Sequence, residues 1–293
     1  KLQPGQGTYS SFLTHKGKML SYFRAYVLPD VVWLEDVGEI EDATFLALKK
    51  FLLYGTKAKM ENCGSSWGLL LVSGPQAGSL MATVSGIQMA EQPMLTVVSA
   101  EIAGHACLLV RTEETGETDI EIFVQTQGLP VVWDRLWSVG APLGLKAIGS
   151  QAREVLRLEA GLPKAGKELT EEIVPPEANL EGKAFSLNKG CYPGQEVVAR
   201  MDTYGNVRRR MVGMTLSGDL LPPHGAKLFS GDREVGWVSS AAVSSAMGCL
   251  IALGFPLRDF SAPGTELSVQ FNEGQSTATV HALPFDVRRP ETV

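Results

Sequence analysis

The sequence lacks the residue patterns of most metal, disulfide and nucleotide sites. Its four cysteines and four histidines stand far apart, with no CxxC, HExxH or paired-ligand spacing, which argues against a zinc site and a disulfide framework. It has neither a Rossmann nor a P-loop glycine pattern, and no apolar run approaches the roughly 18 residues of a membrane span. We therefore expect no metal site and no membrane partner. The scattered cysteines favour a reducing, cytoplasmic setting.

The composition is that of an ordinary globular chain with room for two or three domains. It has 293 residues, 44% of them hydrophobic and 20% charged, with a formal net charge of -6. Such an acidic chain lacks the domain-wide basic surface that nucleic-acid binding usually needs. Residues 183–210, however, carry six basic side chains against two acidic ones. That local excess suits an anionic partner, or it belongs to a solvated strand that merely carries arginines.

Hydrophobic periodicity and turn residues divide the chain into three parts. We expect strands at 8–14, 19–27 and 31–34 with a helix at 41–53, then strands at 68–73, 107–111 and 120–124 with helices at 76–84 and 130–139. From residue 211 onward short β runs alternate with proline and glycine turns. The pattern predicts an α+β protein with two split β-α-β (ferredoxin-like) layers and a C-terminal antiparallel β-barrel. The expected domains are 1–62, 63–207 and 208–293.

The segment Lys189–Glu196, KGCYPGQE, contains the residues that packing explains least. Pro193 and Gly194 suit the two central positions of a type II turn, and a short helix is expected at 195–201. Cys191 would then lie close to a helix N-terminus and two residues from a lysine, a setting that favours the thiolate. Cys191 is thus either a reactive thiol or a small buried hydrophobe.

A third helix of interest is expected at 150–160, with Gly161 at its C-terminal cap. Arg153 and Arg157 stand four residues apart on one face of this helix. Together they either grip a carboxylate or pair with Glu154 and solvent.

These segments together resemble a known family. The KGCYPGQE motif resembles the signature of the YgfZ-type folate-binding proteins, the iron–sulfur assembly branch of the glycine-cleavage T-protein (aminomethyltransferase) superfamily. The segments RLEAGLP at 157–163, PEANL at 176–180 and VSGPQA at 72–77 are similar to further parts of that superfamily. The resemblance implies a three-domain ring around a central folate-binding cavity.

The resemblance also implies roles for particular residues. Glu121 matches the acid that holds the pterin, and Arg153 matches the folate-binding arginine. A carboxylate facing the amino-pyrimidine edge accepts hydrogen bonds from adjacent N–H donors. Cys191 and Lys189 would do chemistry, or bind a partner, at the mouth of the cavity. The full set of expected cofactor contacts is Glu121, Arg153, Arg157, Tyr192, Gln195 and Glu196.

Two departures from the family pattern shape the functional expectation. The family's opening strand and helix are not found, so we expect about forty residues, the size of a β-α unit, to precede Lys1 in the gene product. True aminomethyltransferases carry an acidic pair where this chain has Ser21 and Tyr22. We therefore expect a tetrahydrofolate-binding accessory protein that supports iron–sulfur client or assembly proteins. The alternatives are a folate-dependent aminomethyltransferase or demethylase, and a tRNA-modification partner that uses residues 208–210.

Overall fold

The first part of the chain forms a small antiparallel sheet. The computed structural model describes residues 1–36, 43–52, 54–204, 207–272 and 274–287. Strands β1 (Gly7–Leu13), β2 (Met19–Val27) and β3 (Val32–Asp36) pair in that order, and α1 (Ala43–Lys49) follows them. The three strands lie where the sequence predicts them, whereas the expected helix at 41–53 falls partly outside the described residues.

The second part is a four-stranded antiparallel sheet in the order β4 (Trp67–Ser73), β7 (Asp119–Gln125), β6 (His105–Thr112) and β5 (Val97–Ile102). Helices α2 (Ala77–Ser85) and α3 (Leu129–Gly140) contribute to a shared core with this sheet. Strand β5 was not expected from the sequence. Its central residues Ser99 and Glu101 are exposed and polar, which weakens its apolar pattern.

The third part is a closed barrel. Its strands are β8 (Val212–Leu216), β9 (Lys227–Ser230), β10 (Arg233–Ser244), β11 (Cys249–Gly254), β12 (Glu266–Phe271) and β13 (Gly274–His281), which close in the order β10-β11-β8-β13-β12-β9. Closure leaves no unpaired sheet edge. The α+β class with a C-terminal antiparallel barrel is therefore confirmed.

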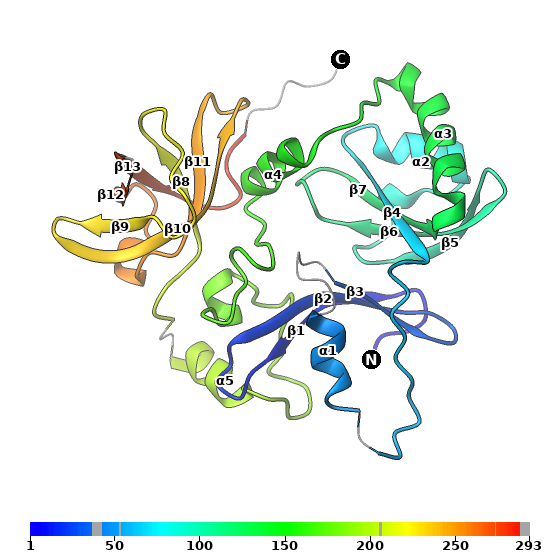
Figure 1. Ribbon diagram of the computed structural model, residues 1–293, viewed down its shortest axis with the longest axis horizontal. Helices are drawn as coiled ribbons and strands as arrows, with labels where there is room; N and C mark the ends of the chain where they lie inside the picture. The colour runs from blue at the N-terminus through cyan, green and yellow to red at the C-terminus, as the bar shows by residue number, and fades with distance from the viewer. Residues whose placement is uncertain (37–42, 53, 205–206, 273, 288–293) are drawn as a thin grey trace.

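The remaining helical elements connect these three parts. Helix α4 (Ser150–Glu159) lies between the barrel and the four-stranded sheet, and α5 (Gln195–Tyr204) lies beside the β1–β2 hairpin (Figure 1). Short 3-10 turns occur at Met89–Glu91, Thr126–Gly128, Ala141–Leu143, Pro175–Ala178 and Arg258–Phe260. Among the described residues, none of the helices combines the length and the apolar character that a membrane crossing requires.

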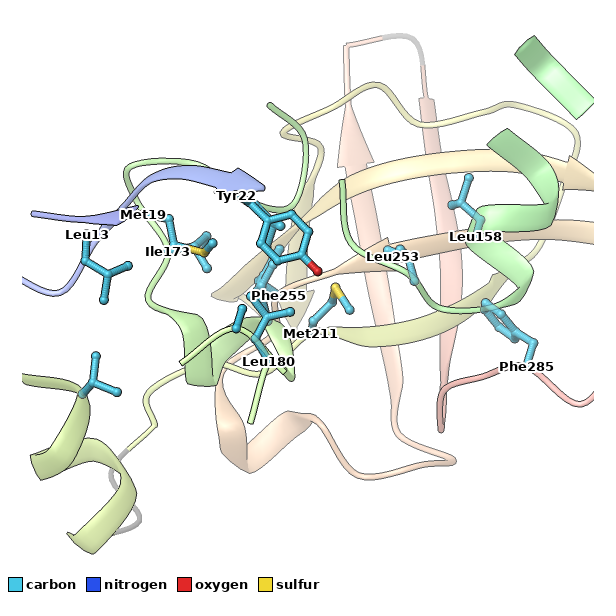
Figure 2. Close-up of a cluster of buried hydrophobic side chains, with 14 of the residues drawn as sticks. Leu13, Met19, Tyr22, Leu158, Ile173, Leu180, Met211, Leu253, Phe255 and Phe285 are labelled. Atoms are coloured by element: carbon cyan, nitrogen blue, oxygen red, sulfur yellow. The ribbon is translucent and has the colours of Figure 1, made fainter. Parts of the chain in front are cut away.

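One hydrophobic core ties distant parts of the chain together. Figure 2 shows Leu13 and Met19 from the β1–β2 hairpin, Ile173 and Leu180 from the segment after α4, and Phe255 from beyond β11 in one cluster. The sequence pattern places the segment after α4 in the part 63–207 that contains the second sheet, whereas in the structure this segment packs on the first hairpin and the barrel. The domain boundaries themselves stay a prediction.

Candidate functional site

A cavity of about 1360 Å³ lies where the three parts of the chain meet. Its lining comes from the first sheet, from β7 and the loop before it, from α4 and from the end of the barrel. Charged side chains of both signs are prominent in this lining. A cavity of this size and polarity accommodates a large ligand with several hydrogen-bonding groups.

Strand β2 presents an arginine to this cavity. Side chains two residues apart on a strand share a face, so Tyr22, Arg24 and Tyr26 point the same way, and all three are buried. Arg24 is only 1% exposed. A buried guanidinium needs counter-charges, because an isolated buried ion loses its hydration.

Three carboxylates from different elements surround Arg24. Its Nη2 lies 2.7 Å from an oxygen of Glu35 on β3 and 2.7 Å from Glu121 Oε1 on β7. Its Nη1 lies 3.1 Å from Glu114 Oε1, in the loop before β7. The Tyr26 hydroxyl donates to the second oxygen of Glu35 at 2.8 Å. One cation therefore joins the first sheet to the second.

Glu121 is the residue of this cluster with a free acceptor. Its side chain is 1% exposed, between the fully buried Ile120 and Ile122. Its Oε1 accepts from Arg24, but its buried Oε2 has no hydrogen-bond partner among the described residues. Burial raises the pKa of Glu121 to about 8, although Arg24 opposes the shift. An unpaired buried oxygen in a cavity wall is a natural contact for a ligand donor.

The loop before β7 is held in place by Asp119. This fully buried carboxylate accepts the backbone N–H groups of Glu114 and Thr115 at 2.7 and 2.8 Å, and the Thr115 hydroxyl at 2.8 Å. The same hydroxyl lies 2.7 Å from that of Ser73 on β4. Glu114 is thereby placed to reach two arginines from a fixed backbone position.

Arg153 and Arg157 have different surroundings, although both lie on α4. Arg153 is 51% exposed and its Nη2 lies 2.6 Å from Glu114 Oε2. Arg157 is buried and its guanidinium pairs with Glu154 and Glu168 at 2.6 and 2.9 Å. Both arginines line the cavity, but only Arg153 has substantial accessible surface for a ligand.

Two tyrosines form an aromatic wall of the cavity. The rings of Tyr9 and Tyr22 stack with centroids 5.6 Å apart and planes 9° apart. Burial raises the pKa of both hydroxyls, so both stay neutral at physiological pH. This wall therefore offers the cavity a flat aromatic surface.

The KGCYPGQE motif adopts the expected turn. Gly194 has a φ of +80°, and the Gln195 N–H donates to the Tyr192 carbonyl at 3.2 Å, as a type II turn requires. A Cβ on Gly194 would come within 2.5 Å of the Thr14 carbonyl oxygen and 2.7 Å of Gly17. The motif is therefore in close backbone contact with the β1–β2 turn.

The side chains of the motif lie outside the described cavity lining. Cys191 is exposed, and Lys189 Nζ lies 4.9 Å from the centre of the Tyr192 ring. Tyr192 is half-buried, and burial raises the pKa of its hydroxyl. Gln195 and Glu196 begin α5. The structure thus brings Glu121, Arg153 and Arg157 into one cavity and places the motif apart from them.

Arg24, Glu35 and Glu114 are site residues that sequence reasoning missed. The signal was present in β2, where a charged residue occupies the apolar face of an alternating strand between two tyrosines. Such a residue requires buried counter-charges. No local pattern indicates that these come from residues 11, 90 and 97 positions further along the chain.

The fold and the cavity define a three-part α+β protein with a C-terminal barrel and a buried glutamate, Glu121, in the cavity lining. A family model described as the GCVT N-terminal domain matches residues 1–189, and one described as the glycine cleavage T-protein C-terminal barrel domain matches residues 209–286. The chain therefore belongs to the glycine cleavage T-protein family.

Individual relatives agree with this assignment. An aminomethyltransferase of Saccharopolyspora erythraea is 31% identical over 283 residues, which cover 96% of this chain and 77% of the relative. An aminomethyltransferase of Moorella thermoacetica is 30% identical over 237 residues, covering 81% and 64%. The crystal structure of the glycine cleavage system aminomethyltransferase T from Bartonella henselae has a TM-score of 0.82 and 23% identity, covering 97% of this chain and 77% of that one.

These comparisons correct the branch inferred from the motif. The YgfZ assignment and the iron–sulfur role are wrong, because relatives at 27–31% identity over most of the chain are named aminomethyltransferases. None of these relatives is named for an iron–sulfur or tRNA partner. The expected tetrahydrofolate is confirmed, since aminomethyltransferases of this family use it as one-carbon acceptor.

Proposed function

We propose that this chain is a folate-dependent aminomethyltransferase of the glycine-cleavage type. Such an enzyme moves the methylene carbon of a carrier-bound aminomethyl group onto two nitrogens of tetrahydrofolate. The bonds from this carbon to its own nitrogen and to the carrier break, and the two protons displaced from the folate nitrogens leave with the ammonia and the free carrier. The observation that carries the proposal is that Oε2 of Glu121, a residue lining a cavity of about 1360 Å³, has no hydrogen-bond partner among the described residues. The names of the relatives, which cover most of the chain, support it.

The cavity suits a reduced folate in both charge and shape. The amino-pyrimidine edge of the pterin carries adjacent N–H donors that match the carboxylate of Glu121. Arg153 on α4 offers an accessible guanidinium to an anionic group of the ligand. The stacked rings of Tyr9 and Tyr22 supply an apolar surface for a flat ring system.

Without the acidic pair on β2, the groups that could transfer protons must come from other elements. Because Ser21 and Tyr22 replace it, β2 gives the cavity no carboxylate. The acids nearest to the ligand site come from β3, from the loop before β7 and from β7 itself. We propose that Glu114, which is 12% exposed and held at a fixed backbone position, supplies the carboxylate that the reaction needs.

Cys191 and Lys189 have no assigned part in this reaction. Their exposed position outside the cavity lining supports a role in contacting a partner, such as a protein that carries the aminomethyl group, better than contact with folate. That role, the domain boundaries and the cytoplasmic location stay predictions.

A transfer assay tests the proposal. Purified protein is incubated with tetrahydrofolate and an aminomethylated carrier protein, and ammonia and methylene-tetrahydrofolate are measured together. The proposal expects both products in equal amounts and a loss of at least tenfold in rate for Glu114→Gln. As a control, Glu234→Gln on the barrel surface should keep the wild-type rate. Folate binding without ammonia release would refute the transferase reading.

A further inference from the structure

In the cavity wall, one arginine forms ion pairs with three carboxylates. Arg24 contacts Glu35, Glu114 and Glu121 within 2.7 to 3.1 Å. All of these side chains are at most 12% exposed. One buried positive charge cannot neutralise three negative charges. At least one of the three carboxyl groups is therefore placed here by the fold, although its negative charge is unfavourable at this position.

The contacts of Arg24 are also unevenly distributed. Its Nη2 donates to both Glu35 and Glu121, while Nε and Nη1 meet no acceptor with hydrogen-bond geometry among the described residues. Oε1 of Glu121 is therefore held by Arg24, whereas the buried Oε2 of this cavity-lining residue has no partner among the described residues. A purely structural ion pair would normally satisfy these atoms, because each unpaired buried polar atom costs free energy.

We propose that Arg24 is a positioning residue that fixes Glu121 with one oxygen bound and the other presented to the ligand. Through Glu114 it also sets the position of Arg153, since the two oxygens of Glu114 contact the two arginines at 3.1 and 2.6 Å. Arg24 thus holds both expected folate contacts in one arrangement. The inference deepens the proposed function and rests on it for the identity of the ligand.

The other members of the cluster decide how strongly Arg24 acts on Glu121. Arg24 lowers the pKa of Glu121, whereas burial, Glu35 and Glu114 raise it. The titratable and charged groups that face this carboxyl from the neighbouring elements are Arg24, Tyr26, Tyr9, Glu35 and Glu114, with Arg153 beyond Glu114. Removing Glu35 should therefore act on Glu121 in the opposite direction to weakening Arg24.

Two variants separate positioning from mere packing. Arg24→Lys keeps the charge but lacks the planar fork that reaches several carboxylates together. Glu35→Gln keeps the shape and relieves the competition for Arg24. The probe is 5-formyltetrahydrofolate, titrated calorimetrically from pH 6 to 9 into wild type, both variants and the control Arg111→Lys, whose guanidinium contacts a backbone carbonyl outside the cavity.

We expect wild-type affinity to rise with pH as Glu121 ionises, with the midpoint of the rise near pH 8 and a plateau above it. Arg24→Lys should weaken binding at pH 7 at least tenfold and move this plateau to higher pH. Glu35→Gln should move the plateau to lower pH without weakening binding, and Arg111→Lys should match wild type. If Arg24→Lys does not fold, Glu35→Gln still tests the inference, because the inference requires the plateau of affinity to move to lower pH in that variant.

A ligand-free measurement distinguishes failure of the inference from failure of the proposed function. The Glu121 carboxyl is followed by ¹³C NMR in protein labelled at glutamate, and its signal is assigned by its loss in Glu121→Gln. Opposite shifts of its titration in Arg24→Lys and Glu35→Gln support positioning, whether or not folate binds. An unchanged titration in both variants overturns the inference. Wild type that binds no folate but shows these shifts overturns the proposed function alone.

Discussion

Two buried arginines of this chain illustrate how a structural ion pair differs from a ligand site. Arg157 on α4 donates to Glu154, to Glu168, to Ser240 and to the Leu162 carbonyl. Arg24 is also buried, but two of its nitrogens and one oxygen of its partner Glu121 have no hydrogen bond within the part of the chain that the structure describes. The first cluster is complete within the protein, and the second requires something further.

The partner of Arg157 is equally satisfied. Glu168 Oε1 accepts from the hydroxyls of Ser239 and Ser240 at 2.7 and 2.6 Å, and its Oε2 accepts from Arg157 at 2.9 Å and from the Lys164 N–H at 3.1 Å. These bonds join α4 and the segment after it to β10 of the barrel. Fully connected polar networks of this kind rigidify a fold. We therefore assign the Arg157 cluster to stability and the Arg24 cluster to binding.

The largest expected effect tests this division. Arg157→Met should lower the free energy of unfolding by about 3 to 5 kcal/mol, because it leaves Glu168 buried without its counter-charge. Lys227→Met is the matched control, since Lys227 and Glu234 pair at 2.9 Å with both side chains about half-exposed. That loss should stay below about 1 kcal/mol. Urea unfolding measures the free energy of unfolding of both variants. Equal losses in the two variants would contradict the assignment of the Arg157 cluster to stability.

A second prediction concerns the contact between the KGCYPGQE turn and the β1–β2 turn. Gly194→Ala should cost about 1 to 3 kcal/mol, because the residue has positive φ and its new Cβ would meet the Thr14 carbonyl. Gly190→Ala is the control within the same motif, since nothing lies within 4 Å of a Cβ there. Urea midpoints of the two variants should differ clearly. If they coincide, the backbone contact does not stabilise the fold.

The raised pKa of Glu121 predicts a pH dependence of stability. Between the ordinary carboxyl pKa and about 8 the folded state holds a proton that the unfolded state has released. The free energy of unfolding should therefore fall as pH rises through this window, by at most about 1.4 kcal/mol per pH unit from this group. Glu121→Gln should flatten the decline, as unfolding curves from pH 5 to 8 can measure. A slope unchanged by the substitution would mean that Glu121 is ionised throughout.

The smallest effect is expected at the motif cysteine. Cys191→Ser should change the free energy of unfolding by less than about 0.5 kcal/mol, because Cys191 is exposed. Cys107→Ser should cost about 1 to 3 kcal/mol, since Cys107 on β6 is buried in the core that the four-stranded sheet shares with α2 and α3, and a hydroxyl would be desolvated there. Thermal unfolding compares the two. A large loss at Cys191 would show that it packs against something in solution.

Sequence reasoning recovered the elements whose signals are local. The alternation in β2, the Gly161 stop of α4 and the Pro193–Gly194 turn each depend on a few neighbouring residues, and each lies where it was expected. Glu121 and Arg153 were named through family resemblance and share one cavity in the structure. Their functional roles remain predictions.

The rest depended on contacts between distant residues. Nothing near Arg24 indicates that Glu114 and Glu121 would meet it, because that contact is made by two separate sheets. The KGCYPGQE turn likewise depends on a distant contact, because Gly194 packs closely on the backbone of Gly17. Placing Cys191 at the mouth of the folate cavity required tertiary information that a turn and a helix start do not contain.

The central claim is that the cavity around Glu121 binds a reduced folate. Calorimetric titration of 5-formyltetrahydrofolate into wild type, Glu121→Ala and the surface control Glu234→Ala tests it most directly. Removing one partner of a buried charged hydrogen bond typically costs about 2 to 5 kcal/mol of binding. The account predicts binding by wild type and by the control, and at least tenfold weaker binding by Glu121→Ala while that variant stays folded. Equal affinity of wild type and Glu121→Ala, or no binding by wild type, would contradict it.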